Sequence, residues 1–243
     1  MTTSTESRMT YSRLIGALFL FGFLFYGVGN GVASSVLSTP GFLSAIPAHQ
    51  ATLFFGALLM LLNTVVDVGK GVLFFPIVEN YGRRTALTYF AALIVQVVLM
   101  DVGVLCLLMI APLGQYAADA GAASADWANT LGSVLIQANS MAYQIGQATL
   151  GGGALFLCSL LFRTRLIPRF LAAWGVMGYA MHLTGAIAEI FGIHISLVLL
   201  IPGGLFEVGL TCWLLTRGFQ PEAYAHRADV AVTPNLRPAA VAL

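Results

Sequence analysis

Long apolar segments separated by short polar connections dominate this sequence. A bilayer core of about 30 Å needs about 20 apolar residues in an α-helix. Six segments meet that requirement, at residues 14–37, 50–78, 85–112, 133–162, 170–191 and 195–216, within a single domain of residues 14–218. Because the connections are short, consecutive helices are expected to pack as antiparallel neighbours. The pattern therefore predicts an all-α, polytopic membrane protein whose six transmembrane helices form one bundle.

The basic residues predict how this bundle is oriented. Ten of the eleven Lys and Arg residues lie before the first segment, in the second or fourth connection, or after the last segment: Arg8, Arg13, Arg83, Arg84, Arg163, Arg165, Arg169, Arg217, Arg227 and Arg237. The remaining connections contain no Lys or Arg. Cytoplasmic loops carry the excess of positive charge in membrane proteins. We therefore expect both termini in the cytoplasm, an N-in, C-in topology.

The two ends and the longest connection are expected to lack regular structure. The first ten residues are polar and rich in Thr and Ser, within a cytoplasmic tail of residues 1–13. Residues 219–243 are rich in Ala and contain three prolines, so we expect a disordered cytoplasmic tail there as well. Residues 113–132 are expected to form a solvated outer loop, although Tyr116 and Trp127 would also suit the membrane interface.

Composition supports a membrane protein and argues against other classes. Hydrophobic residues make up 58% of the chain and charged residues 9%, whereas soluble proteins contain about a quarter charged residues. The net charge of +1 provides no basic patch, so no nucleic-acid partner is expected. The three cysteines lie inside apolar segments and do not indicate a disulfide framework. The lipid bilayer is the expected partner, a lipid-like or small amphipathic ligand is an open alternative, and the oligomeric state is left open.

Polar residues inside the apolar segments recur at helical spacing. Asn63, Asp67 and Lys70 lie at i, i+4 and i+7 of the second segment, and therefore on one face. An ionisable side chain at the centre of a membrane costs roughly 2.5–3.5 kcal/mol, so such residues are expected to face a partner or a cavity. The candidate ligand- or proton-binding residues are Tyr26, Asn30, Asn63, Asp67, Lys70, Asp101, Gln144, Gln147, His182, Glu189 and Glu207.

Counting from the flanking arginines at about 1.5 Å per residue places four of these candidates at similar depth. They are Asp67, Lys70, His182 and Glu207, whereas Asp101 and Glu189 lie farther toward the outer side. Lys70 is the only lysine of the chain. One interpretation is an ion-paired triad of Asp67, Lys70 and Glu207 that fixes helix register. The other is a polar cavity for a ligand or a path for protons.

Metal and cofactor chemistry is not indicated by the histidines. A haem held by two histidines within the membrane needs both at matching depth, and only His182 qualifies. His49 and His194 both lie at the outer surface, and two histidines without a placed carboxylate are weak evidence for a metal site. We therefore expect no metal, and the sequence identifies no cofactor.

Two stretches resemble a known family. The first is Leu-Leu-Phe-Arg-Thr-Arg-Leu-Ile-Pro-Arg at residues 160–169, followed by Gly175 and Gly178-Tyr179. The second is Ile-Pro-Gly-Gly-Leu-Phe-Glu at residues 201–207, followed by Trp-Leu-Leu and Arg-Gly. Together with Asp67 they resemble DUF4386, a family of bacterial six-span membrane proteins. The resemblance implies the same topology and a location in the bacterial inner membrane, and it implies no activity.

Three functions are compatible with the sequence. The polar interior could bind or pass a lipid-like or other small amphipathic ligand, or protons. It could be the site of an intramembrane enzyme in which Asp67 or Glu207 acts as general base and His182 as acid. The polar residues and glycines could instead serve helix contacts in a structural or assembly subunit. The sequence leaves all three open.

Overall fold

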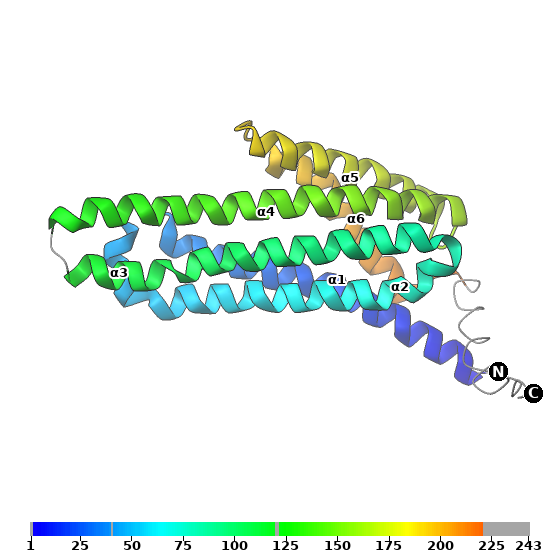
Figure 1. Cartoon of the computed structure of the whole chain (residues 1–243). Helices are drawn as coiled ribbons and strands as arrows, with labels where there is room; N and C mark the ends of the chain where they lie inside the picture. Colours follow the sequence, from blue (N-terminus) through cyan, green and yellow to red (C-terminus); the bar gives the residue numbers. More distant parts are fainter. Residues whose placement is uncertain (1, 40, 120–121, 221–243) are drawn as a thin grey trace, which may run out of the picture.

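The computed structural model describes residues 2–39, 41–119 and 122–220, and in these residues helices are the only regular structure. The helices are α1 (Thr2–Leu37), α2 (Phe42–Leu108), α3 (Ile110–Asp119), α4 (Ala122–Thr164), α5 (Arg169–Ile190) and α6 (Ser196–Thr216). They pack as an elongated bundle in which α5 and α6 lie at an angle to the longer helices (Figure 1).

Helix α2 is a hairpin of two helical arms. Gly82 has φ −176° and ψ 79°, which are not helical values, and it separates the two arms. In a straight helix, Phe75 and Phe90 would lie about 22 Å apart, yet their ring centroids are 6.2 Å apart. Near the other end of the arms, Gln115 Nε2 donates a hydrogen bond to Gln50 Oε1 at 3.1 Å. Figure 1 shows the arms side by side, so the two apolar segments at residues 50–78 and 85–112 are antiparallel neighbours.

The outside of the bundle is suited to lipid. Five helical stretches of the described chain are long and apolar enough to cross a membrane, and one of them, Phe42–Asp119, contains the hairpin. Large apolar side chains are exposed on every one of the long helices, including Phe21, Phe55, Val65, Phe156, Phe170, Met177, Leu197 and Val198. Apolar patches of this extent do not occur on soluble monomers. The chain is therefore an all-α, multi-pass membrane protein.

One end of the bundle collects the arginines. Arg13 Nε donates to the backbone oxygen of Leu215 at 3.1 Å, which joins α1 to the end of α6. The amide of Gln220 donates to the backbone oxygen of Leu166, which joins the chain after α6 to the α4–α5 connection. The hairpin turn at Gly82 lies at the same end (Figure 1). This arginine end carries Arg13, Arg83, Arg84, Arg163, Arg165, Arg169 and Arg217, and we call the opposite end the distal end.

Helices α5 and α6 are about half as long as α4. With 22 and 21 residues, α5 and α6 are about 33 and 32 Å long, close to the thickness of a bilayer core. With 43 residues, α4 is about 65 Å long. At the distal end α4, the α2 hairpin and α3 therefore extend past α5 and α6 (Figure 1).

This distal extension corrects the expected outer loop at residues 113–132. The segment is helical in its described residues, because α3 ends at Asp119 and α4 begins at Ala122. A side chain at Gly114 would meet Ile46 Cβ at 2.7 Å, so α3 packs tightly against the first arm of α2. Contacts between helices, which local sequence does not reveal, stabilise helical structure here.

The expected disorder of the N-terminal tail was also wrong for residues 2–10, because α1 begins at Thr2. Tyr11 Oη donates to the backbone oxygen of Leu73 at 2.5 Å, so the start of α1 packs on α2. After α6, Phe219 is buried and its ring contacts Phe74. The rest of the tail expected at residues 219–243, from residue 221 onward, lies outside the described residues.

Two apolar clusters form the core. The arginine-end cluster includes Ile15, Phe19, Phe74, Tyr89, Phe206 and Leu214. The distal cluster includes Ala33, Leu53, Met60, Val104, Ile110 and Ala128. Buried polar side chains lie along the helices between the clusters, among them Asn63, Asp67, Gln96, Gln144, Gln147 and His182. The interior of the bundle is therefore polar between the two apolar clusters.

Candidate functional site

A cavity of about 630 Å³ occupies this polar region. Residues from α1, both arms of α2, α4, α5 and α6 line it. Toward the arginine end it reaches Lys70, Tyr179 and Glu207, and we call this the closed end because the ring of Tyr179 packs there against Phe206, which is 1% exposed. Toward the distal end it reaches Leu197, which is 74% exposed. Since Glu207 and Leu197 are ten residues apart on α6, the cavity extends about 15 Å along that helix.

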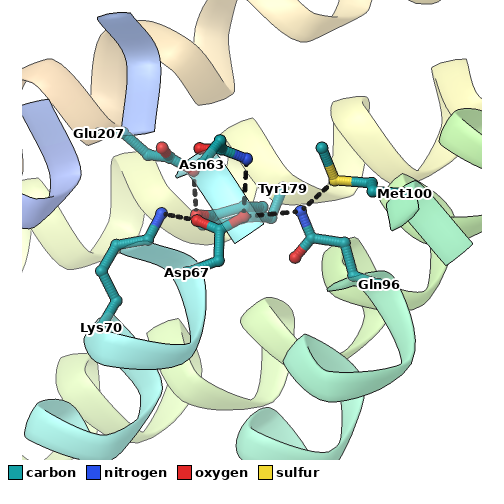
Figure 2. Close-up of polar contacts among 7 residues, drawn as sticks. All are labelled: Asn63, Asp67, Lys70, Gln96, Met100, Tyr179 and Glu207. Carbon is teal, nitrogen blue, oxygen red and sulfur yellow. Dashed lines mark hydrogen bonds and ion pairs between the residues drawn. The ribbon is translucent and has the colours of Figure 1, made fainter. Parts of the chain in front are cut away.

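Asp67 is the centre of the closed end of the cavity, where three donors converge on it (Figure 2). Lys70 Nζ lies 2.5 Å from Asp67 Oδ1. Asn63 Nδ2 and Gln96 Nε2 donate to Asp67 Oδ2 at 3.1 and 3.5 Å. Lys70 Nζ also lies 4.8 Å from the centroid of the Phe19 ring. The charge of Asp67 is thus compensated by groups from both arms of the hairpin.

Glu207 has a different environment. Its Oε1 accepts a hydrogen bond from Tyr179 Oη at 2.5 Å (Figure 2). Within the described residues Glu207 forms no ion pair, and the side chain of Lys70 pairs only with Asp67. The ion-paired triad considered from the sequence is therefore a pair, and Glu207 is bound by a neutral phenol.

The contact between Tyr179 and Glu207 depends on close packing of α5 against α6. A side chain at Gly178 would meet Gly203 Cα at 2.9 Å. Only glycine allows the two backbones to approach to this distance, as small residues do in membrane helix pairs. The glycines predicted to allow close helix approach therefore also position the phenol of Tyr179 beside the carboxylate of Glu207.

His182 lies one turn from Tyr179 and faces the same cavity. Its Nε2 is 2.9 Å from Gln147 Oε1, which connects α5 to α4. Gln144 Nε2 donates to Ser196 Oγ at 3.4 Å, which connects α4 to the start of α6. The side-chain amides of Gln144 and Gln147 on α4 therefore bind polar side chains of α5 and α6 that line the cavity.

Tyr26 and Asn30 bring α1 into the site. Both line the cavity, and the Tyr26 ring stacks on the Tyr143 ring of α4 with centroids 5.0 Å apart and planes 12° apart. The stack joins two helices that are distant in sequence, and it provides an aromatic wall beside the polar groups.

Two of the predicted candidates are not part of this site. Asp101 does not line the cavity, and its Oδ1 is buried with no hydrogen-bond partner among the described residues. Glu189 lies near the distal end of α5, where its carboxylate contacts His194 Nδ1 at 2.7 Å and the Ser196 amide at 3.3 Å. The other nine candidates line the cavity: Tyr26, Asn30, Asn63, Asp67, Lys70, Gln144, Gln147, His182 and Glu207.

Among the lining residues that were not candidates from sequence, Gln96, Tyr179 and Tyr143 contact candidate side chains directly. Gln96 is the one amide in a long apolar stretch of the third predicted segment, which was a usable signal. Tyr179 lies three residues before His182, and thus on the same helical face. Tyr143 lies four residues before Gln147, and thus also on the face of a candidate.

Comparison with known proteins gives a family and no further relative. The family described as "Domain of unknown function (DUF4386)" matches residues 14–218. No curated protein and no solved structure matches the chain.

Proposed function

The chain belongs to the DUF4386 family, as its two motifs predicted, and on that premise we propose that it is a six-pass plasma-membrane protein that binds a small amphipathic ligand in its central cavity. The description of the family names no activity, so the proposal derives from the cavity and its lining. A receptor and a transporter would both first bind their ligand in this cavity.

The proposed topology follows from the hairpin and the arginine end. Each arm of α2 is long enough to cross a bilayer, so the five apolar stretches would make six crossings. Arginines concentrate on the cytoplasmic side of membrane proteins. The arginine end is therefore assigned to the cytoplasm of a bacterium, with both termini on that side and the cavity opening outward.

Cysteine labelling tests this topology. We would place one cysteine at a time, Arg84→Cys or Ala118→Cys, in a chain whose three native cysteines are replaced. A membrane-impermeant maleimide should label Ala118→Cys in intact cells and Arg84→Cys only after permeabilisation. The reverse result would refute the orientation. Labelling of both from the same side would refute two crossings by the hairpin.

The observation that carries the ligand proposal is the combination of cavity size and lining. A volume of about 630 Å³ lies within the range of roughly 300–1,000 Å³ typical of small-molecule sites. The charged groups Asp67, Lys70 and Glu207 lie at the closed end, whereas nearer the distal end Ile136, Leu197 and Leu200 line the cavity beside uncharged polar residues such as Gln144 and Ser196. A ligand with a polar head and a largely apolar body would match this distribution.

The acid–base pair of an intramembrane enzyme has less support. That function requires His182 and a carboxylate to act on one substrate together. His182 Nε2 contacts Gln147 Oε1, and Glu207 Oε1 accepts a hydrogen bond from Tyr179 Oη. Neither group is paired with the other, so the arrangement favours binding over proton transfer between them.

A cavity-filling variant tests the ligand proposal. Ser140 lines the cavity from α4, and Ser140→Phe would occupy part of its volume. Gln137, on the same helix, is exposed and does not line the cavity, so Gln137→Phe is the matched control. Native mass spectrometry of protein purified in lipid nanodiscs should detect a bound small molecule in the wild type and in Gln137→Phe, and lose it in Ser140→Phe. If Ser140→Phe retains the same molecule, or the wild type carries none, the cavity is not the binding site.

A further inference from the structure

The two carboxylates at the closed end of the cavity are unequally satisfied. Asp67 accepts a cation and two amide donors from the protein itself. Glu207 receives a single hydrogen bond, from the neutral hydroxyl of Tyr179 to Oε1. Within the described residues no donor is bonded to Glu207 Oε2, although the side chain lines the cavity. The protein itself thus supplies Asp67 with a cation and hydrogen-bond donors on both oxygens, whereas Glu207 has no cation and a donor on only one oxygen.

The charges around the cavity are unbalanced in the same direction. Among the described residues that line it, Asp67 and Glu207 each carry a formal negative charge and Lys70 carries the one formal positive charge, with His182 counted as neutral. Lys70 forms its direct ion pair with Asp67 and acts on Glu207 only at longer range. The lining therefore keeps one formal negative charge in excess, and Glu207 is the carboxylate of the lining without a direct cationic partner. In a membrane interior such a charge needs a partner.

The other groups near Glu207 also suit a cation. The rings of Phe23, Tyr26, Tyr143 and Tyr179 line the cavity, and aromatic faces attract ammonium groups. Gln96 Oε1 is buried with no donor among the described residues, so the closed end has unused acceptors. The one cation that a carboxylate ligand would meet among the described lining residues is Lys70, which Asp67 already holds.

We propose that the ligand is an organic monocation, an ammonium group on an apolar body, and that Glu207 anchors its charged head. The inference rests on the proposed ligand-binding function and specifies the class of ligand. A bare inorganic cation would leave most of the 630 Å³ unused, and the apolar residues toward the distal end would have no counterpart. The ammonium lies against Glu207 and the apolar body extends toward Leu197.

Matched probes of different charge test this inference. The protein in lipid nanodiscs is titrated with n-octylammonium, n-octanol and octanoate, and the shift of its melting temperature is followed. Octylammonium should bind the wild type more tightly than octanol does, and octanoate least. Glu207→Gln should weaken octylammonium binding about tenfold or more, as expected when a charge-assisted hydrogen bond is lost, without weakening octanol binding.

Two control variants make the result specific. Asp101→Asn removes an intramembrane carboxylate that does not line the cavity, so it should bind octylammonium as the wild type does. Glu207→Asp keeps the charge and should retain a preference for octylammonium over octanol. The melting temperature of each variant without probe is measured first, so that loss of binding is not confused with loss of folding.

The outcomes separate this inference from the proposal that it rests on. If octanol binds the wild type as tightly as octylammonium, or if Glu207→Gln binds octylammonium unchanged, the cationic ligand is refuted. Ser140→Phe still tests the cavity, because it should abolish octanol binding in that case. Preference for octanoate, or a melting-temperature shift from sodium or potassium alone, also refutes the inference. If no amphiphile binds any variant, both proposals are wrong.

Discussion

Replacing Asp67 by Asn should destabilise the protein far more than replacing Glu207 by Gln. The two substitutions are chemically equivalent, since each converts a carboxylate to its amide at a similar depth. They differ in what they leave behind. Asp67→Asn leaves Lys70 without an anion, at a position where its side chain is only 12% exposed. Glu207→Gln leaves no cation unpaired, and its amide oxygen can still accept the hydrogen bond from Tyr179.

The magnitudes follow from these contacts. Removing one partner of a buried ion pair typically costs about 3–5 kcal/mol, because the other charge is left uncompensated. Weakening one hydrogen bond of a neutral donor costs about 0.5–1.5 kcal/mol. We therefore expect Asp67→Asn to lower the free energy of unfolding by at least about twice as much as Glu207→Gln.

The assay is reversible unfolding in mixed micelles of dodecyl maltoside and sodium dodecyl sulfate, followed by far-ultraviolet circular dichroism. The decisive control is the double variant Asp67→Asn/Lys70→Met, which removes both charges of the pair. It should recover most of the stability lost in Asp67→Asn, because an ion pair can often be replaced by uncharged groups at little cost. The coupling energy between the two positions should exceed about 2 kcal/mol in a double-mutant cycle.

Two results would refute this reasoning. Equal losses of stability in Asp67→Asn and Glu207→Gln would mean that Lys70 compensates both carboxylates, and that the triad exists in the membrane. A double variant that is less stable than Asp67→Asn alone would mean that Lys70 stabilises the fold independently of Asp67.

Two glycine substitutions give further tests. Gly178→Val should destabilise the protein by about 1–3 kcal/mol, because a side chain there would meet Gly203 Cα at 2.9 Å. The control is Gly152→Val on α4, where nothing lies within 4 Å of an added Cβ. In the same unfolding assay this control should show only its helix-propensity effect. Gly22→Ala should weaken ligand binding with little loss of stability, because its methyl group would lie 3.3 Å from Lys70 Nζ, where that flexible side chain can shift into the cavity. A Gly178→Val protein as stable as Gly152→Val, or unchanged ligand affinity in Gly22→Ala, would contradict these expectations.

Helix ends were harder to predict than helix centres. Residues 113–119 and 122–132, expected as a loop, and residues 2–10, expected to be disordered, are helical. The first segment is rich in Ala, the strongest helix former, which was a usable signal, whereas the second is polar and gave none. Long-range contacts support the helices there, with Gly114 against Ile46 and with Tyr11, just after the second segment, against Leu73.

The site residues were predicted in part for a clear physical reason. Intramembrane polar groups are unfavourable next to lipid, so their positions alone place them inside the bundle. That argument found nine residues of the cavity and also included Asp101 and Glu189, which lie elsewhere. It could not tell which side chains of different helices contact each other, because the depth of a residue does not show how its helix is rotated relative to its neighbours.

The sequence by itself determined the class of this protein, its apolar helices, its family and the inward position of Asp67, Lys70, His182 and Glu207. Those properties follow from the length and periodicity of local segments, which a bilayer constrains strongly. Asp67 and Lys70 are three residues apart on one helix, so the sequence already placed them within reach of each other. Only the tertiary structure decided that Gln96 belongs to Asp67 and that Tyr179 belongs to Glu207. Such pairings depend on the register between helices, which is set by the turn at Gly82 and by close contacts such as Gly178 on Gly203. The unequal satisfaction of two similar carboxylates is therefore a property of packing.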